Sequence, residues 1–253
     1  MLGRLPSKLQ QIWRELESRR EEKPNGLVPP TVMLTAALIL LFQQVWGNCN
    51  TFEHLFARYA AWRWFELGSF VWWTCSKLVG YIAVPMIVLW RLGLPLSDLG
   101  WSTHGLGSHA KIYVTMFLLV LPAVIVASGT LPFLSTYPFY RLAYRSWPDL
   151  LIWEGCYALS FLALEVFFRG FMLFPLQRAF GGHAIWIMVI PYCMIHFQKP
   201  AAEALGAVGA GVVLGGLALW TRSIWSGVLI HVAVAWTMDL LALSKGNGFP
   251  SLH

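Results

Sequence analysis

The chain has 253 residues, of which 57% are hydrophobic and only 12% are charged. Soluble globular domains carry about 25% charged residues, so this composition indicates a membrane protein and argues against a soluble enzyme. The formal net charge is +6, but the basic residues form no patch with interleaved aromatic side chains. The charge therefore favours contact with the anionic lipid bilayer and does not indicate nucleic acid as a partner.

Residues 1–30 are predicted to form an amphipathic arm. Leu5, Leu9, Ile12 and Leu16 recur at three- and four-residue spacing, with basic residues among the polar positions. We interpret this pattern as a helix on the membrane surface; the alternative is a solvated arm. Six Lys or Arg residues precede the first apolar run, so we expect the N-terminus to be cytoplasmic.

Seven apolar runs follow, most of them near the roughly 20 residues that a transmembrane helix needs. In chain order they are 31–46, 68–90, 112–131, 150–178, 184–197, 204–220 and 224–243. The sequence therefore predicts an all-α, polytopic membrane bundle of about seven to eight transmembrane helices. We divide it into N-terminal helices (31–149), motif-bearing helices (150–243) and a C-terminal tail (244–253).

One stretch, from Ala163 to Phe171, places a carboxylate and a guanidinium four residues apart in an otherwise almost entirely apolar run. At helical pitch, Glu165 and Arg169 lie one turn apart on the same face, so the two side chains can meet. An ionisable residue inside a membrane segment is costly, and it therefore indicates a functional site. The alternative is a structural ion pair that fixes the position of the helix.

Two later apolar runs each carry a histidine, His196 and His231. With Glu165 they match a divalent-metal site, in which His196 and His231 would ligate zinc. They also match a metal-free site, in which the glutamate activates water and the histidines stabilise the oxyanion. Each histidine has a plainer interpretation as a hydrogen-bonded packing residue. Further acidic candidates are Glu154, Glu203 and Asp239.

The pattern Glu165-Val-Phe-Phe-Arg169-Gly170, followed by Tyr192-xxx-His196 and then His231, resembles the three motifs of the CPBP superfamily. These intramembrane endopeptidases include the type II CAAX prenyl endopeptidases and the bacteriocin self-immunity proteins. The resemblance covers roughly residues 150–243. The family motifs are Glu-Glu-xxx-Arg, Phe-xxx-His and His-xxx-Asn or His-xxx-Asp, and their polar side chains face a common interior cavity.

The sequence departs from these motifs at three positions. The first glutamate falls on Leu164, Tyr192 stands for the Phe, and Ala235 stands for the Asn or Asp. The resemblance therefore leaves Glu165 as the carboxylate that can act as the base. Tyr192 adds a hydroxyl, whereas Leu164 and Ala235 remove polar groups from the expected cavity.

The resemblance implies hydrolysis of a peptide bond near the C-terminus of a membrane-anchored protein or peptide. Glu165 would be the general base, Arg169 its orienting partner, and His196 and His231 ligands of water, metal or oxyanion. The remaining residues expected at the site, as substrate-binding positions, are Tyr192, Phe168 and Asp239. The resemblance also implies a multi-pass protein of a bacterial inner membrane, similar to members that trim C-terminal membrane anchors.

Two alternatives stay open. A catalytically degenerate member would bind a membrane peptide or act as an immunity protein, and the apolar residues Leu164 and Ala235 favour it. A transporter would use the same charges to line a pathway, and it would typically carry broken helices in an internal repeat. No such repeat stands out in the sequence, so the transporter is the weaker alternative.

Overall fold

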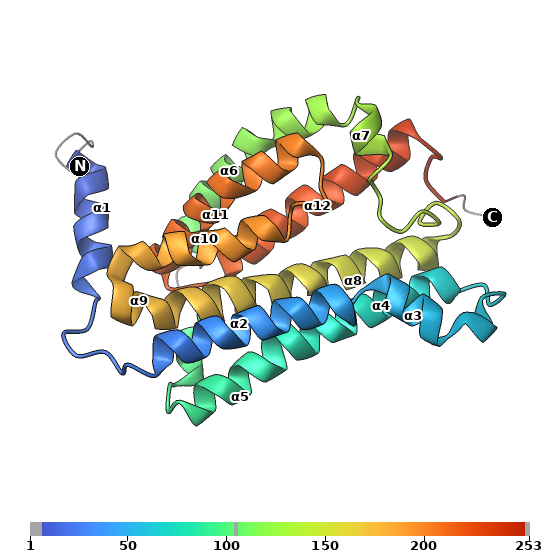
Figure 1. The fold of residues 1–253 in the computed structure, drawn as a ribbon. Helices are drawn as coiled ribbons and strands as arrows, with labels where there is room; N and C mark the ends of the chain where they lie inside the picture. Colours follow the sequence, from blue (N-terminus) through green and yellow to red (C-terminus); the bar gives the residue numbers. More distant parts are fainter. Residues whose placement is uncertain (1–6, 104–105, 251–253) are drawn as a thin grey trace. The chain divides into compact units, whose positions relative to one another are not determined.

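The computed structural model describes residues 7–103 and 106–250, which form helices joined by loops (Figure 1). No strand occurs among these residues, so the predicted all-α class is confirmed. Residues 1–6 of the expected arm and 251–253 of the expected tail lie outside them. The α-helices are α1 (Ser7–Ser18), α2 (Val28–Val45), α3 (Cys49–Leu55), α4 (Phe65–Lys77), α5 (Val84–Arg91), α6 (Leu106–Ala127), α7 (Leu131–Leu134), α8 (Trp147–Glu165), α9 (Phe174–Phe180), α10 (Ala184–Met194), α11 (Ala201–Thr221) and α12 (Trp225–Lys245).

Within the described residues, six helical stretches are long and apolar enough to cross a membrane, as befits an integral membrane protein. The predicted count of seven to eight is not confirmed, because the expected fifth span is the short helix α10. Its 11 residues fall below the roughly 20 that a span needs, and α10 belongs to one long stretch with α8 and α9. The six stretches are Val28–Val45, Phe65–Arg91, Leu106–Ala127, Trp147–Met194, Ala201–Thr221 and Trp225–Lys245.

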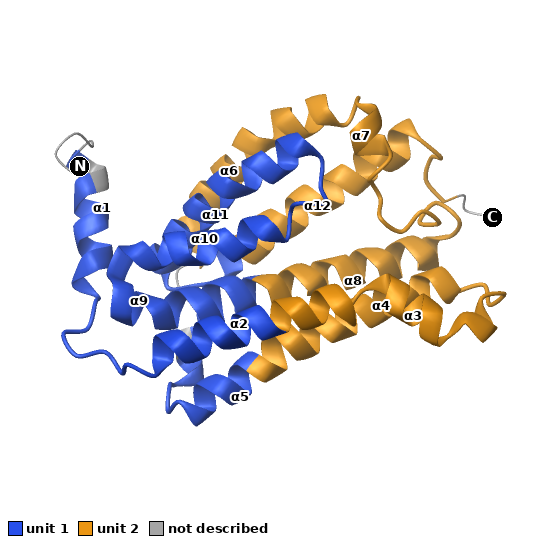
Figure 2. Ribbon diagram, in the orientation of Figure 1, with its two compact units in different colours: residues 1–38, 85–105, 165–226 blue, residues 39–84, 106–164, 227–253 orange. Residues whose placement is uncertain are grey.

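The fold comprises two compact units, each assembled from three separate segments of the chain (Figure 2). Unit 1 contains Met1–Leu38, Pro85–Gly105 and Glu165–Ser226. Unit 2 contains Ile39–Val84, Leu106–Leu164 and Gly227–His253. The chain passes from unit 2 to unit 1 between Leu164 and Glu165, in the middle of the motif.

In unit 1, the stretch from Val166 to Gln177 is buried at every residue. Helices α10 and α11 pack closely beside it because α11 carries glycines on the contact face. A Cβ atom at Gly211 would lie 2.9 Å from the ring of Tyr192, and one at Gly215 would lie 2.9 Å from Met188 Cε. Small residues allow such close helix packing in lipid, and here they bring α10 against the motif segment.

In unit 2, hydrogen bonds fix the start of α8, the helix that leads to the motif. Asp149, in its first turn, is buried and accepts a hydrogen bond of 2.6 Å from Arg145 Nη2, as well as bonds from the Tyr140 and Ser146 hydroxyls. The bond to Asp149 raises the pKa of Arg145. An acidic residue here also complements the positive end of the helix dipole. One turn later, Trp153 is fully buried in an aromatic core.

Candidate active site

The motif lies where the α8 helix changes its hydrogen-bonding pattern. Glu165 is the last residue of α8, and Val166–Leu173 form the π-helical segment η5 before α9 begins. π-Helical turns are rare and occur frequently at functional sites. The sequence predicts a regular helix through this stretch. The nearby signal for a disturbed helix was Pro175, which has no backbone N–H to donate.

Glu165 and Arg169 form a salt bridge, with Arg169 Nη1 3.0 Å from Glu165 Oε1. Both residues are 0% exposed, so neither charge is stabilised by bulk water. Burying an ion pair carries a desolvation penalty, which is offset only where geometry and further contacts favour the charges. The pairing that the four-residue spacing allows is therefore present, and it is fully enclosed.

Tyr192 of α10 provides one of those further contacts. The Arg169 guanidinium lies over the Tyr192 ring, 4.6 Å from its centroid, in a cation–π arrangement. The ring of Phe168 meets the same tyrosine edge-on, with centroids 5.3 Å apart. The hydrophobic segment η5 and α10 thus hold the guanidinium between a carboxylate and an aromatic face.

His196 follows the end of α10 and is also held by Tyr192. The two ring centroids are 4.9 Å apart, and His196 Nδ1 lies 2.8 Å from the Tyr192 backbone oxygen. A carbonyl oxygen only accepts hydrogen bonds, so Nδ1 must carry the hydrogen. In the neutral ring, Nε2 then carries the lone pair, and it is the atom that can accept from water or bind a metal. We call Glu165, Arg169, Tyr192 and His196 the motif cluster.

His231 and Asp239 belong to unit 2, on α12. The His231 ring stacks on Phe161 of α8, with centroids 5.2 Å apart and planes 9° from parallel. Asp239 is fully buried and accepts a hydrogen bond of 2.7 Å from Trp153 Nε1. The expected convergence of His231 with Glu165 and His196 stays a prediction.

The two positions where the family motifs lose a polar group are packing positions in unit 2. Leu164 is 6% exposed, and Ala235 is 3% exposed within the aromatic core that contains Trp153. Of the other acidic candidates, Glu203 pairs with Lys199 at 3.2 Å, one turn away. Glu154 is half-buried on α8, and its backbone oxygen accepts a hydrogen bond from Trp236.

The two histidines proposed as zinc ligands lie in different units, His196 in unit 1 and His231 in unit 2. Across residues 7–103 and 106–250, no three His, Cys, Asp or Glu side chains are grouped so that they could hold a metal ion. A catalytic zinc site has three protein ligands and one open position. Zinc ligation by His196 and His231 stays a prediction for metal analysis.

Part of the chain matches a known protein family. Residues 146–237 match the family model described as type II CAAX prenyl endopeptidase Rce1-like. This segment is therefore similar to the Rce1-like family. The match confirms the resemblance to the CPBP superfamily, and a protease family agrees with the buried Glu165 carboxylate. No curated protein and no solved structure matches the chain.

The Rce1-like segment begins just before α8 and ends within α12. It spans the whole motif cluster and His231, whereas Asp239 lies two residues beyond its end. The N-terminal arm and helices α2 to α6 lie outside it. The family match therefore covers the motif-bearing helices and not the N-terminal ones.

Proposed function

We propose that the chain is an intramembrane endopeptidase that hydrolyses a peptide bond near the C-terminus of a membrane-anchored protein or peptide. The Rce1-like match supports the reaction class. The observation that carries the proposal to particular residues is the fully buried Glu165–Arg169 pair at the start of the π-helical segment. Burying a charge pair in an apolar interior costs free energy. A catalytic role would explain why the pair is present.

In the proposed mechanism, Glu165 takes a proton from water as the water oxygen attacks the scissile carbonyl carbon. Only a carboxylate can accept that proton, and the carboxylate is also the form that pairs with a guanidinium. The carbon–nitrogen bond then breaks, and the proton passes from Glu165 to the leaving amine. Arg169, held over the Tyr192 ring, orients the carboxylate for both transfers.

The histidines act on the water and on the developing charge. His196 Nε2 carries the lone pair, because Nδ1 donates to the Tyr192 carbonyl, so Nε2 positions the water by accepting its hydrogen. We assign oxyanion stabilisation to His231, which requires a hydrogen on a ring nitrogen. Phe168, Tyr192 and Asp239 remain our proposed substrate-binding residues. All three side chains are buried.

The test is cleavage of a C-terminally anchored reporter in membranes. Glu165→Gln, His196→Ala and His231→Ala should each abolish cleavage at equal membrane abundance. His183→Ala is the matched control, because His183 packs edge-on against Trp13 and belongs to no motif. Glu165→Asp keeps a carboxylate for Arg169 and should retain partial activity. Partial activity in this variant would show that Glu165→Gln loses cleavage because it loses the carboxylate. Normal cleavage by Glu165→Gln removes the base assignment and directs attention to Glu203 or Asp239.

The second candidate function is a degenerate member that binds a membrane peptide without cutting it. The specific observation in its favour is that Leu164 and Ala235 are both buried, Ala235 within the aromatic core. Reporter binding without cleavage, unaffected by His196→Ala, would support it.

We also propose an inner-membrane location in a bacterium with a cytoplasmic N-terminus. Zinc content of the purified chain, compared with that of His196→Ala, tests the metal prediction.

A further inference from the structure

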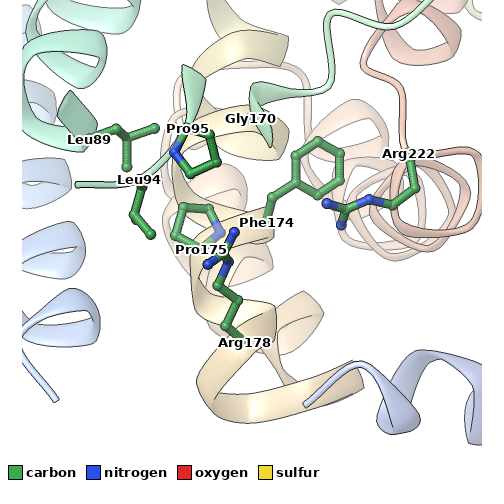
Figure 3. A pocket seen from close by; sticks show the side chains of 8 residues that line it. All are labelled: Leu89, Leu94, Pro95, Gly170, Phe174, Pro175, Arg178 and Arg222. Atoms are coloured by element: carbon green, nitrogen blue, oxygen red, sulfur yellow. The ribbon is translucent and has the colours of Figure 1, made fainter. Parts of the chain in front are cut away.

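Unit 1 contains a polar cavity that the proposed reaction does not use. Its volume is about 370 Å³, within the range of small-molecule sites. Its walls come from the chain just after α1, from α9 and from the loop after α11. The lining residues are Arg19, Glu21, Phe174, Gln177, Arg178 and Arg222. Figure 3 shows the small adjoining recess, where Arg178 and Arg222 lie on either side of Phe174.

Neutral oxygen atoms and an aromatic ring hold two of the three arginines. Arg19 Nη1 donates to the Leu219 backbone oxygen at 2.8 Å. Arg222 Nη1 donates to Gln177 Oε1 at 3.1 Å, and its guanidinium lies over the Phe174 ring, 4.6 Å from the centroid. These contacts fix the guanidinium groups through partners that carry no charge.

Carboxylates neutralise only part of the positive charge of the cavity. Glu21 lies 3.3 Å from Arg178, and Glu15, outside the lining, lies 3.0 Å from Arg19. With Glu15 counted, three arginines against two glutamates leave an excess of one positive charge at the cavity. Guanidinium groups match the oxygen geometry of phosphate, to which they donate paired hydrogen bonds.

The cavity lies at the ends of apolar helices. Arg222 directly follows the candidate span that ends at Thr221, and the span of α2 begins at Val28, seven residues after Glu21. Trp220, beside Arg222 in sequence, is 40% exposed, as expected of an aromatic side chain at a membrane interface. Lipid phosphate groups occupy this boundary, and basic clusters there attract anionic lipids.

We propose that this cavity binds the phosphate group of an anionic phospholipid, with Arg19, Arg178 and Arg222 as its ligands. The bound lipid would join the N-terminal arm to α9 and to the end of α11. This site is separate from the motif cluster, and the proposal does not depend on peptidase activity.

The experiment measures lipid binding to the detergent-purified full chain by native mass spectrometry, with phosphatidylglycerol and phosphatidylcholine as probes. Phosphatidylglycerol should bind the wild-type chain, and Arg19→Gln, Arg178→Gln and Arg222→Asn should each weaken binding about tenfold, since each removes a charge-assisted hydrogen bond. Asn is chosen at position 222 because the backbone there is left-handed, with φ of 54°, which Asn tolerates.

The matched controls are Arg14→Gln and Arg20→Gln, which remove the same charge from exposed positions near the cavity. They should bind phosphatidylglycerol as the wild type does. Equal losses in the controls and the cavity variants would overturn the proposal, as would equal binding of phosphatidylcholine. Displacement of the lipid by millimolar inorganic phosphate would overturn the assignment to a lipid in favour of a soluble anion. Thermal unfolding without added lipid confirms that each variant is folded.

Discussion

At the residue scale, the central feature is a charged pair enclosed by apolar side chains. The four-residue spacing of Glu165 and Arg169 predicted that the side chains could meet, because helical pitch alone puts them on one face. The contact of Arg169 with Tyr192 could not be predicted in the same way. It joins residues 23 positions apart on different elements, and it depends on how α10 packs.

The buried pair has a measurable effect on stability. Arg169→Leu leaves the Glu165 carboxylate enclosed without its counter-charge, and we expect a loss of about 3–5 kcal/mol in the free energy of unfolding. The double variant Glu165→Leu/Arg169→Leu should lose less than the sum of the two single variants, because it leaves no uncompensated charge. Denaturant titration of the detergent-solubilised chain, followed by tryptophan fluorescence, measures all three.

The matched control for this prediction is the pair Lys199 and Glu203, which has the same spacing but is partly exposed. Lys199→Leu should cost no more than about 0.5 kcal/mol, as is usual for exposed pairs one turn apart. Equal costs for the exposed and buried pairs would show that burial adds nothing at Arg169. Additive losses in the double variant would show that the two charges are not coupled.

At the element scale, the apolar runs predicted the helices, and the differences have local causes. Helix α2 begins at Val28 and includes Pro29 and Pro30, although the prolines were expected to precede the span. Proline is tolerated in the first turn, where its missing N–H has no helical partner. The π-helical segment η5 has only the nearby Pro175 as a local signal, and its hydrogen bonds form within a fully buried stretch.

The glycines of α11 give the element-scale prediction. In Gly211→Ala, the new Cβ would lie 2.9 Å from Tyr192 Cδ1 and 3.0 Å from Val189 Cγ2, so α10 or the tyrosine must shift. We expect a loss of about 1–3 kcal/mol in the free energy of unfolding, as for overpacked cores. Because Tyr192 holds both Arg169 and His196, reporter cleavage should fall as well. Denaturant titration and the reporter assay measure the two effects.

Gly209→Ala separates this clash from the general effect of removing a helical glycine. A Cβ atom at position 209 would meet nothing within 4 Å. Alanine is the better helix former by about 1 kcal/mol, so Gly209→Ala should leave stability unchanged or raise it. If both variants behave alike, close packing of α11 on Tyr192 does not matter for the site.

At the scale of the whole molecule, the sequence indicated the membrane class and the family motifs but not the grouping of segments. Each compact unit combines three segments from distant parts of the chain. No local pattern specifies that grouping, since it arises from tertiary packing. The arginine cavity was missed for the same reason: Arg19, Arg178 and Arg222 belong to three different segments in sequence, and each alone resembles an ordinary helix-end cation.

The division of the motif residues between the two units leads to the last prediction. His196 belongs to unit 1 and His231 to unit 2, and our proposed mechanism assigns both to one reaction. Residues that act together in catalysis show strongly non-additive losses. His196→Gln and His231→Gln are conservative changes chosen to leave measurable cleavage. If the histidines serve one step, the double variant should be no slower than the slower single variant.

Independent roles would instead make the losses in rate multiply. His183→Gln provides the reference, because His183 contacts Trp13 and not the motif cluster. Combined with His196→Gln, it should leave the rate of the single variant unchanged. Multiplicative losses for His196 and His231 would assign them to separate steps or separate sites, and the mechanism would then rest on Glu165, Arg169 and His196 of unit 1 alone.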